Sequence, residues 1–192
     1  MLKHLFFLKF GLGLIISFAS FNTSKNVFTT KNNLKPDHSL AQAAQIKVYL
    51  FLLDECRITQ ELVPELNNIY DKFGDQVEII GVFPNFSSKK ENIETFKKDH
   101  HITFDTKTDY FKKLSVKFDI QVLPEGVIVN SNDIIIYKGA INSLFIARGR
   151  RIKTKPIPHL YNAIQAAITN PELIQKFHPA VGCAVNYADN LK

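Results

Sequence analysis

The chain has 192 residues, 45% hydrophobic and 22% charged, a composition that suits a folded globular protein with room for one ordinary domain. Its net charge of +6 falls to +4 without the first 19 residues, which hold two lysines and leave 22 basic against 18 acidic residues. An excess this small and dispersed argues against nucleic-acid binding, and two cysteines are too few for a disulfide scaffold but suit a redox pair.

The first 19 residues have the pattern of a secretory signal peptide. A basic start precedes an apolar run at residues 10–16, and small residues follow at 17 and 19 in an Ala-x-Ala-like pattern. The uncharged run, residues 10–21, is shorter than the about 20 residues that a transmembrane helix needs. We therefore expect an exported protein, periplasmic or extracellular, with no stable membrane span.

A flexible leader is expected next, over residues 20–45, because this segment is rich in Asn, Thr, Ser and Lys and has little periodicity. The folded domain, with a C-terminal tail, is expected to cover residues 46–192. It begins with an apolar run, residues 46–53, that is typical of a strand buried on both faces in a parallel sheet.

Cys56 follows this strand and precedes an amphipathic helix, which we predict from Gln60 with Pro64 in its first turn. A thiol at a helix N-terminus meets unpaired N–H groups and the positive end of the helix dipole, and both favour the thiolate. The neighbouring cation Arg57 acts in the same direction, whereas the acidic pair before Cys56 opposes it. Cys56 is the candidate nucleophile; the alternative is an inert buried cysteine.

The remaining pattern alternates strands and helices. In chain order we predict a helix ending at Gly74, a strand at 77–83, a serine-capped helix at 89–98, an extended piece at 102–104, a helix at 110–118, strands at 126–129 and 134–137, a basic loop at 143–155, a helix at 158–168 and a short helical piece at 172–177. Parallel β-α-β units followed by a hairpin and a helix predict one α/β domain, a three-layer α/β/α sandwich with a mixed central sheet.

Several stretches resemble the thioredoxin-like redoxin proteins, often grouped with the alkyl hydroperoxide reductase/thiol-specific antioxidant family. They are residues 54–73, with the cysteine and its helix, the Leu-Pro-Glu at 123–125, Tyr-Lys-Gly-Ala-Ile-Asn at 137–142 and Gly-Cys-Ala-Val at 182–185. The resemblance implies a thioredoxin-like fold, a part in antioxidant defence and cell redox homeostasis, and no organic cofactor.

The chain also departs from related patterns. Thr59 stands where thioredoxin-like reductases usually have the second cysteine of Cys-x-x-Cys; its hydroxyl can donate a hydrogen bond to the Cys56 thiolate. Leu53 and Tyr49 occupy the threonine and proline positions of typical peroxiredoxins. Gln60 stands where copper-delivery relatives have a second cysteine, so no metal site is expected.

The resemblance also assigns the surroundings of Cys56. It implies that Pro124 is the cis-proline of this fold and lies against Cys56, and that Leu123 and Pro124 present a backbone edge to an extended substrate. Arg57, where the family usually has proline, is a third candidate substrate contact. Cys183 has three alternatives: a resolving partner of Cys56, a thiol that pairs with another chain, or a buried residue of the tail.

The function expected from these residues is thiol–disulfide exchange. Cys56 would attack a disulfide or other oxidised sulfur in a protein or small molecule, and Cys183 or an external thiol reductant would resolve the mixed disulfide. A thiol peroxidase and a non-catalytic thioredoxin-like binding module are the alternatives. The basic residues of the loop at 143–155 are either a solvated surface or a contact for an acidic partner.

Overall fold

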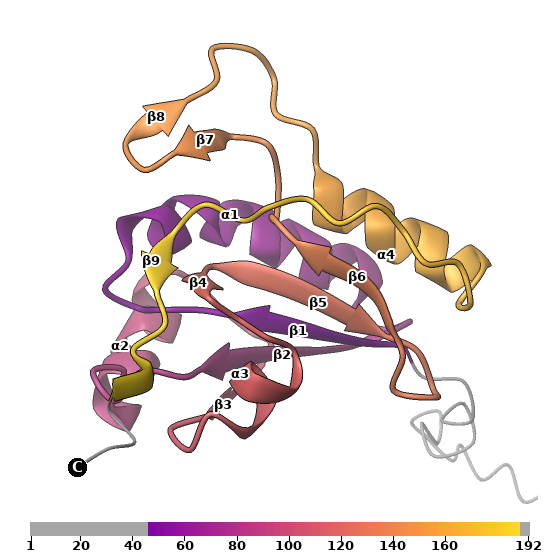
Figure 1. Cartoon of the computed structure of the whole chain (residues 1–192). Helices are drawn as coiled ribbons and strands as arrows, with labels where there is room; N and C mark the ends of the chain where they lie inside the picture. Colours follow the sequence, from indigo (N-terminus) through magenta and orange to yellow (C-terminus); the bar gives the residue numbers. More distant parts are fainter. Residues whose placement is uncertain (1–45, 189–192) are drawn as a thin grey trace, which may run out of the picture. The chain divides into compact units, whose positions relative to one another are not determined.

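The computed structural model describes residues 46–188 (Figure 1). The predicted signal peptide and leader lie outside these residues. The elements are β1 (Lys47–Phe51), α1 (Arg57–Phe73), β2 (Glu78–Phe83), α2 (Lys90–Asp99), β3 (Asp105–Thr108), α3 (Lys113–Lys117), β4 (Val122–Leu123), β5 (Glu125–Val129), β6 (Ile135–Gly139), β7 (Phe145–Ala147), β8 (Arg150–Arg151), α4 (His159–Thr169) and β9 (Cys183–Ala184).

The central sheet is mixed, as predicted. Its five strands lie in the order β3-β2-β1-β5-β6. The first three are parallel, because helices connect them, and β5 and β6 are antiparallel, because β5 reverses beside β1 and a tight hairpin follows. β1 therefore lies in the middle of the sheet and directs its carboxyl end, and the cysteine after it, to one edge of the parallel half.

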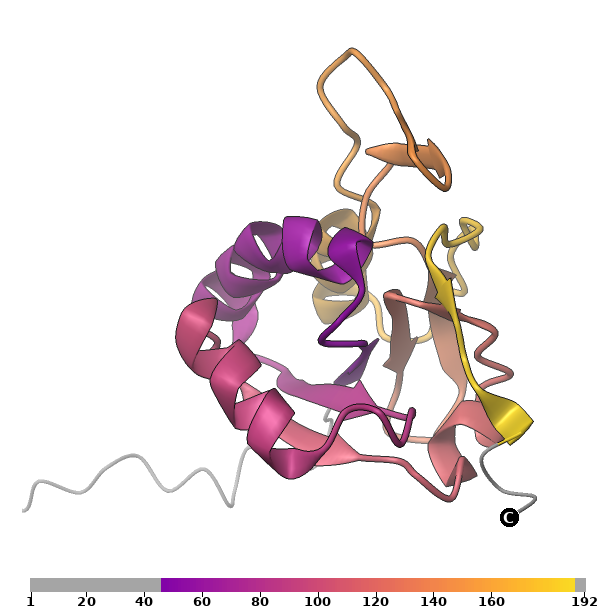
Figure 2. The ribbon, with the colours of Figure 1, turned by 90° about the vertical axis from the view of Figure 1, so that its left-hand side faces the viewer.

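Side chains alternate across β1 and fill two separate cores. Val48, Leu50 and Leu52 face the helices α1, α2 and α4, whereas Tyr49 and Phe51 face α3 and the tail. Figure 2 shows α1 and α2 on one side of the sheet and the tail on the other. The three layers predicted from the sequence are confirmed, with the third made of the short helix α3 and the C-terminal tail.

Beyond the sheet, the tail adds a small second pairing. Its strand β9 runs antiparallel to β4, with Leu123 opposite Cys183 and Val122 opposite Ala184. Gly182 precedes this pair and packs directly on the carbonyl of Leu123. The tail thus returns to the strand that precedes Pro124, where residues far apart in the sequence meet (Figure 1).

Several local predictions were wrong. Helix α1 begins at Arg57, directly after Cys56, so Pro64 lies inside the helix, exposed on its outer face. Strand β3 covers residues 105–108 rather than 102–104, and no helix forms at 172–177. No side chain caps α2, because Ser88 donates its hydroxyl hydrogen to the Asp54 carboxylate instead.

The predicted basic loop also differs, because it contains the hairpin β7–β8. The guanidinium of Arg151 in β8 forms an ion pair with Glu61 of α1, and it lies 5.4 Å from the centre of the Phe145 ring in β7. These contacts hold the hairpin at the N-terminal part of α1. Tertiary contacts therefore order a segment whose composition alone is typical of a loop.

We expect Gly182→Ala to loosen the tail. The added Cβ would overlap the carbonyl oxygen of Leu123, which is backbone and has little freedom to move. The free energy of unfolding should fall by about 1–3 kcal/mol, and amide hydrogen exchange at residues 182–185 should accelerate. Gly149→Ala is the control: it strains the left-handed backbone of the β7–β8 turn (φ 74°), but its Cβ meets nothing within 4 Å, so exchange in the tail should stay slow. Unchanged protection of the tail in Gly182→Ala would contradict this packing.

Candidate functional site

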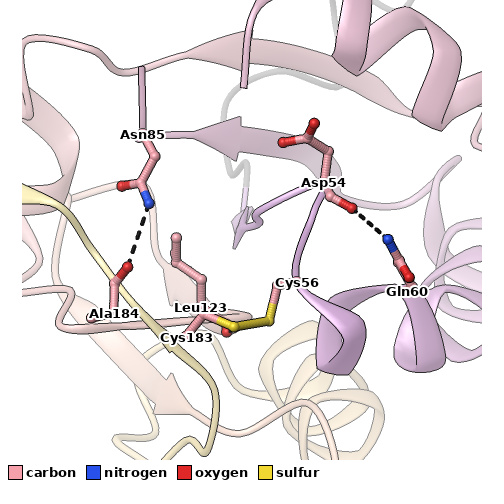
Figure 3. Close-up of a disulfide and its surroundings, with 7 residues drawn as sticks. All are labelled: Asp54, Cys56, Gln60, Asn85, Leu123, Cys183 and Ala184. Atoms are coloured by element: carbon pink, nitrogen blue, oxygen red, sulfur yellow. Dashed lines mark hydrogen bonds between the residues drawn. A yellow bond between two sulfur atoms is a disulfide. The ribbon is translucent and has the colours of Figure 1, made fainter. Parts of the chain in front are cut away.

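The turn between β1 and α1 holds Cys56 in a fixed position. The backbone N–H of Cys56 donates to the carbonyl of Leu53 at 3.1 Å, and the Gln60 side-chain amide donates to the carbonyl of Asp54 at 2.9 Å (Figure 3). Cys56 is the N-cap residue of α1 and only 2% exposed. The Asp54 carboxylate accepts from Ser88 and points away from Cys56. The opposing charge expected from Asp54 is thus engaged elsewhere.

Cys56 and Cys183 form a disulfide bond (Figure 3). Their Cα atoms are 6.3 Å apart, within the range that this bond requires. Of the three alternatives for Cys183, pairing with Cys56 is therefore the one found in the structure. The two cysteines differ in exposure: Cys56 is buried, whereas Cys183 is half-buried.

The tail occupies the backbone edge that the resemblance assigns to a substrate. The peptide bond between Leu123 and Pro124 is cis, as expected, and Leu123 pairs with Cys183 in the β4–β9 ladder. The carbonyl oxygen of Leu123 lies 3.6 Å from the sulfur of Cys56. In this oxidised form the chain's own cysteine-containing strand lies where an extended substrate was expected.

Asn85, after β2, holds the other side of the tail strand. Its side-chain amide donates to the carbonyl of Ala184 at 3.4 Å, and its carbonyl oxygen accepts from the backbone N–H of Asn186 at 2.9 Å. Asn85 is buried, and the sequence analysis did not select it. A polar residue two positions after a buried strand was the available signal.

Thr59 does not form the predicted hydrogen bond with Cys56 in this oxidised form. Its side chain is fully buried, and its hydroxyl oxygen has no hydrogen-bond partner among the described residues. A buried hydroxyl without a partner costs roughly 1–3 kcal/mol. The structure therefore keeps an unused donor one helical turn from Cys56.

Arg57 lies beside the disulfide on the exposed side of α1. Its Nε donates to the Glu61 carboxylate at 3.0 Å. It also lines a pocket of about 370 Å³ next to the disulfide. The other lining residues are Ile58, Glu61, Phe145, Arg148, Gly149, Arg151 and Cys183. The sequence analysis identified Arg57 but could not foresee the pocket, because half of its wall comes from the β7–β8 hairpin.

Glu125 is a second residue near the site that the sequence analysis did not select; it appeared there only as part of the Leu-Pro-Glu stretch. It follows Pro124, is 6% exposed, and lies on the sheet face that Val127 and Val129 share with Cys56. Burial raises the pKa of Glu125 to about 7; the cation Lys138 opposes this rise and Asp119 adds to it. A carboxyl group that titrates near neutral pH thus lies in the strand that follows the cis-proline.

Two further findings bear on the expected absences. Among residues 46–188, no group of three or more His, Cys, Asp or Glu side chains is placed to hold a metal ion. No helix in this range is long and apolar enough to cross a membrane.

The chain is similar to a known protein family and to several solved structures. Residues 45–135 match a family described as thioredoxin-like, whereas no curated protein matches the sequence. A hypothetical protein from Sinorhizobium meliloti 1021 has a similar structure, with a TM-score of 0.64 and 13% identity, covering 77% of this chain and 82% of that one. An uncharacterized conserved protein from Geobacillus kaustophilus has a TM-score of 0.61 and 16% identity, covering 74% and 77%.

A putative thioredoxin from Neisseria meningitidis is also similar, with a TM-score of 0.52 and 16% identity, covering 69% of this chain and 79% of that one. Together with the family match and the sheet order, these structures establish a thioredoxin-like α/β fold. The described part of the chain therefore has a thioredoxin-like fold, with a cysteine pair at disulfide distance. The tail cysteine, Cys183, lies outside the region that the family match covers.

Replacing Glu125 should change how stability depends on pH. Below about pH 4.5 the carboxyl is protonated in both the folded and the unfolded chain, and its contribution to the free energy of unfolding is at its most favourable. As pH rises through 7, the folded chain loses up to roughly 3 kcal/mol, because its pKa is about 7 against 4.5 when exposed. Glu125→Gln should therefore be more stable than wild type at pH 8 and lose this advantage at pH 5.

Urea unfolding at both pH values, without reductant, measures this difference. Glu94→Gln, an exposed carboxylate in α2, is the matched control and should follow wild type at both pH values. A constant stability difference between Glu125→Gln and wild type from pH 5 to 8 would show that Glu125 does not titrate in this interval.

Proposed function

We propose that the protein is an exported thiol–disulfide oxidoreductase of the redoxin type, with Cys56 and Cys183 as its exchanging pair. The observation that carries the proposal is the disulfide itself. It joins the N-terminus of helix α1 to the C-terminal tail, beside the cis-proline Pro124, in a thioredoxin-like fold. A bond that only cross-links the chain has no need of a helix N-terminus next to one of its sulfur atoms.

The chemistry begins with reduced Cys56. Its thiolate attacks one sulfur of a substrate disulfide, forms a mixed disulfide and releases the other sulfur as a thiolate. The Cys183 thiolate then attacks the sulfur of Cys56, which closes the internal disulfide and releases the second substrate thiolate. Two electrons pass from the protein to the substrate, and an external thiol reductant returns them.

Three features support Cys56 as the nucleophile. The N-cap position of α1 places the unpaired N–H groups and the dipole of a 17-residue helix at its sulfur. Thr59 holds a buried hydroxyl without a partner in the oxidised form. Once reduction separates the two sulfur atoms, the Cys56 thiolate can accept hydrogen bonds from this hydroxyl and from the first turn of the helix.

The position of the tail supports Cys183 as the resolving residue. The tail strand β9 covers the edge formed by Leu123 and Pro124, so an extended substrate and the tail compete for the same backbone groups. In the proposed cycle the tail leaves when Cys56 binds substrate and returns when Cys183 attacks. The return displaces the substrate from the edge at the same time as it breaks the mixed disulfide.

Export is part of the same proposal. Residues 1–19 have the pattern of a signal peptide. A stable disulfide needs an oxidising compartment, such as the periplasm or the extracellular space. The substrates would then be thiols and disulfides of that compartment.

Exchange of the cysteine pair is the first test. Oxidised wild type should gain two alkylated thiols after mild reduction, and the reduced protein should cleave a model disulfide and regain its internal bond. Cys56→Ser should abolish this turnover, because the nucleophile is lost. Cys183→Ser should still form a mixed disulfide at Cys56 but accumulate it, since no internal thiol resolves it. Mass spectrometry after acid quenching counts each species.

Three results would contradict the proposal. A disulfide that resists thiols until the chain unfolds would be a structural cross-link. Consumption of peroxide by reduced wild type, with no reaction toward disulfides, would favour the thiol peroxidase. Binding of a partner that Cys56→Ser leaves unchanged, without turnover in wild type, would favour a binding module.

Thr59→Val should stabilise the oxidised protein and make Cys56 of the reduced protein less reactive. The oxidised protein should gain about 1 kcal/mol in unfolding free energy, because the variant removes a buried hydroxyl that has no partner. In the reduced protein, alkylation of Cys56 should reach half its maximal rate about one pH unit higher, because the thiolate loses a donor. Thr59→Ser keeps the donor and is the control; the same alkylation profile in Thr59→Val and wild type would remove Thr59 from the mechanism.

A further inference from the structure

The pocket beside the disulfide is built from two parts of the chain. The first turns of α1 supply Arg57, Ile58 and Glu61, the β7–β8 hairpin supplies four residues, and Cys183 completes the wall. The hairpin lies outside the region of the family match, as Cys183 does. Five of the eight lining residues therefore lie outside the matched region, and three lie within it.

The charge of the pocket is positive. Three arginines and one glutamate line it, which leaves two positive charges. Both oxygen atoms of Glu61 are occupied, one by Arg57 and the other by Arg151. Burial would raise the pKa of Glu61, but the hydrogen bonds and charges of these two arginines hold it below its ordinary value. Glu61 therefore stays ionised and is neutralised within the wall.

Arg148 is the arginine that remains available. It is exposed on the turn between β7 and β8, and it forms no ion pair within the described part of the chain. The hairpin that carries it is fixed, because Arg151 is bound to Glu61 and lies over the ring of Phe145. A guanidinium that such a hairpin carries beside a pocket can bind a carboxylate with two parallel hydrogen bonds.

The pocket also borders one cysteine of the disulfide. Cys183 lines it and is half-buried, whereas Cys56 is 2% exposed and does not contribute to its wall. A thiolate in the pocket thus meets the sulfur of Cys183 first. The group that would leave is Cys56, at the N-terminus of α1, where a thiolate is favoured.

We propose that this pocket binds a small thiol that carries a carboxylate, and that this thiol is the external reductant that exchanges with Cys183. The proposal rests on the proposed function. The thiolate attacks the sulfur of Cys183, the bond to Cys56 breaks, and Cys56 leaves as a thiolate. A second thiol then attacks the mixed disulfide and releases Cys183 with a symmetrical small disulfide. Two thiols supply the two electrons.

A small reductant fits this site better than an extended peptide. The pocket volume of about 370 Å³ lies within the range of small-ligand sites. The backbone edge that would bind a peptide, at Leu123, is covered by β9 as long as the disulfide is intact. The reductant of the oxidised form must therefore reach the disulfide without that edge.

The test compares thiols that differ in charge. The oxidised protein is reduced with mercaptoacetate, 2-mercaptoethanol or cysteamine, and the rate is measured for wild type, Arg148→Gln and Arg150→Gln. The rate of wild type divided by that of each variant is taken for every thiol, so that the intrinsic reactivity of the thiol cancels. Arg150 is the matched control, because it is exposed on the same hairpin but does not line the pocket.

Arg148→Gln should slow mercaptoacetate about three- to fivefold, leave 2-mercaptoethanol nearly unchanged and accelerate cysteamine slightly. Arg150→Gln should change none of these rates by more than about twofold, and 0.5 M NaCl should reduce the effect of Arg148→Gln. For a peptide of nine residues with one cysteine and several acidic side chains, the ratio of the wild-type rate to the Arg148→Gln rate should be much smaller than for mercaptoacetate.

Each other outcome overturns a defined part. Equal effects of Arg148→Gln and Arg150→Gln on mercaptoacetate would mean that net charge, not the pocket, attracts the thiol. An equal gain for the acidic peptide would reject the small-ligand assignment. In both cases the disulfide still exchanges, and the proposed function stands. A disulfide that none of the thiols reduces in the folded protein would instead reject the proposed function.

Discussion

The bond between Cys56 and Cys183 is the interaction on which the arrangement of the site depends. It joins residues 127 positions apart, and closing a loop of this length stabilises a folded chain by roughly 5 kcal/mol in the chain-entropy account. Besides this bond, the tail is held by the two-residue pairing of β4 with β9, by the hydrogen bonds of Asn85 and by those of Val185 and Tyr187 with residues 120–121. With the bond in place, the tail covers the edge at Leu123; without it, the same contacts must hold the tail unaided.

The part of this arrangement that could be predicted from the sequence is local. The apolar run of β1 and the periodicity of α1 placed Cys56 between a central strand and a helix, and the resemblance placed Pro124 in a cis peptide bond. Pro64 misled the prediction of the helix start, because proline favours a first turn, although here it lies in the helix interior and faces solvent. Local patterns therefore identified the candidate nucleophile but placed the start of its helix three residues too late.

The rest could not be predicted, because it depends on contacts between distant segments. Strand β9 has two residues and no periodicity, so nothing in the tail indicated that Cys183 lies opposite Leu123. The hairpin β7–β8 is basic and short, and it is ordered by Glu61, 90 positions before Arg151. From the sequence, Glu125 is a polar residue near a turn, where exposure is expected. Only the packing of the sheet shows that it is buried.

The two sulfur atoms experience opposing influences that suit an exchange reaction. In the proposed reduced form, the N-terminus of α1 would favour a thiolate at Cys56, and the net positive charge of the pocket would favour one at Cys183. The ladder of β4 with β9 and the contacts of Asn85 bring the same sulfur atoms together and stabilise the oxidised form. A structural cross-link needs only the second influence. The chain has features of both kinds, so each redox state would be stabilised by interactions that the other lacks, as the proposed exchange reaction requires.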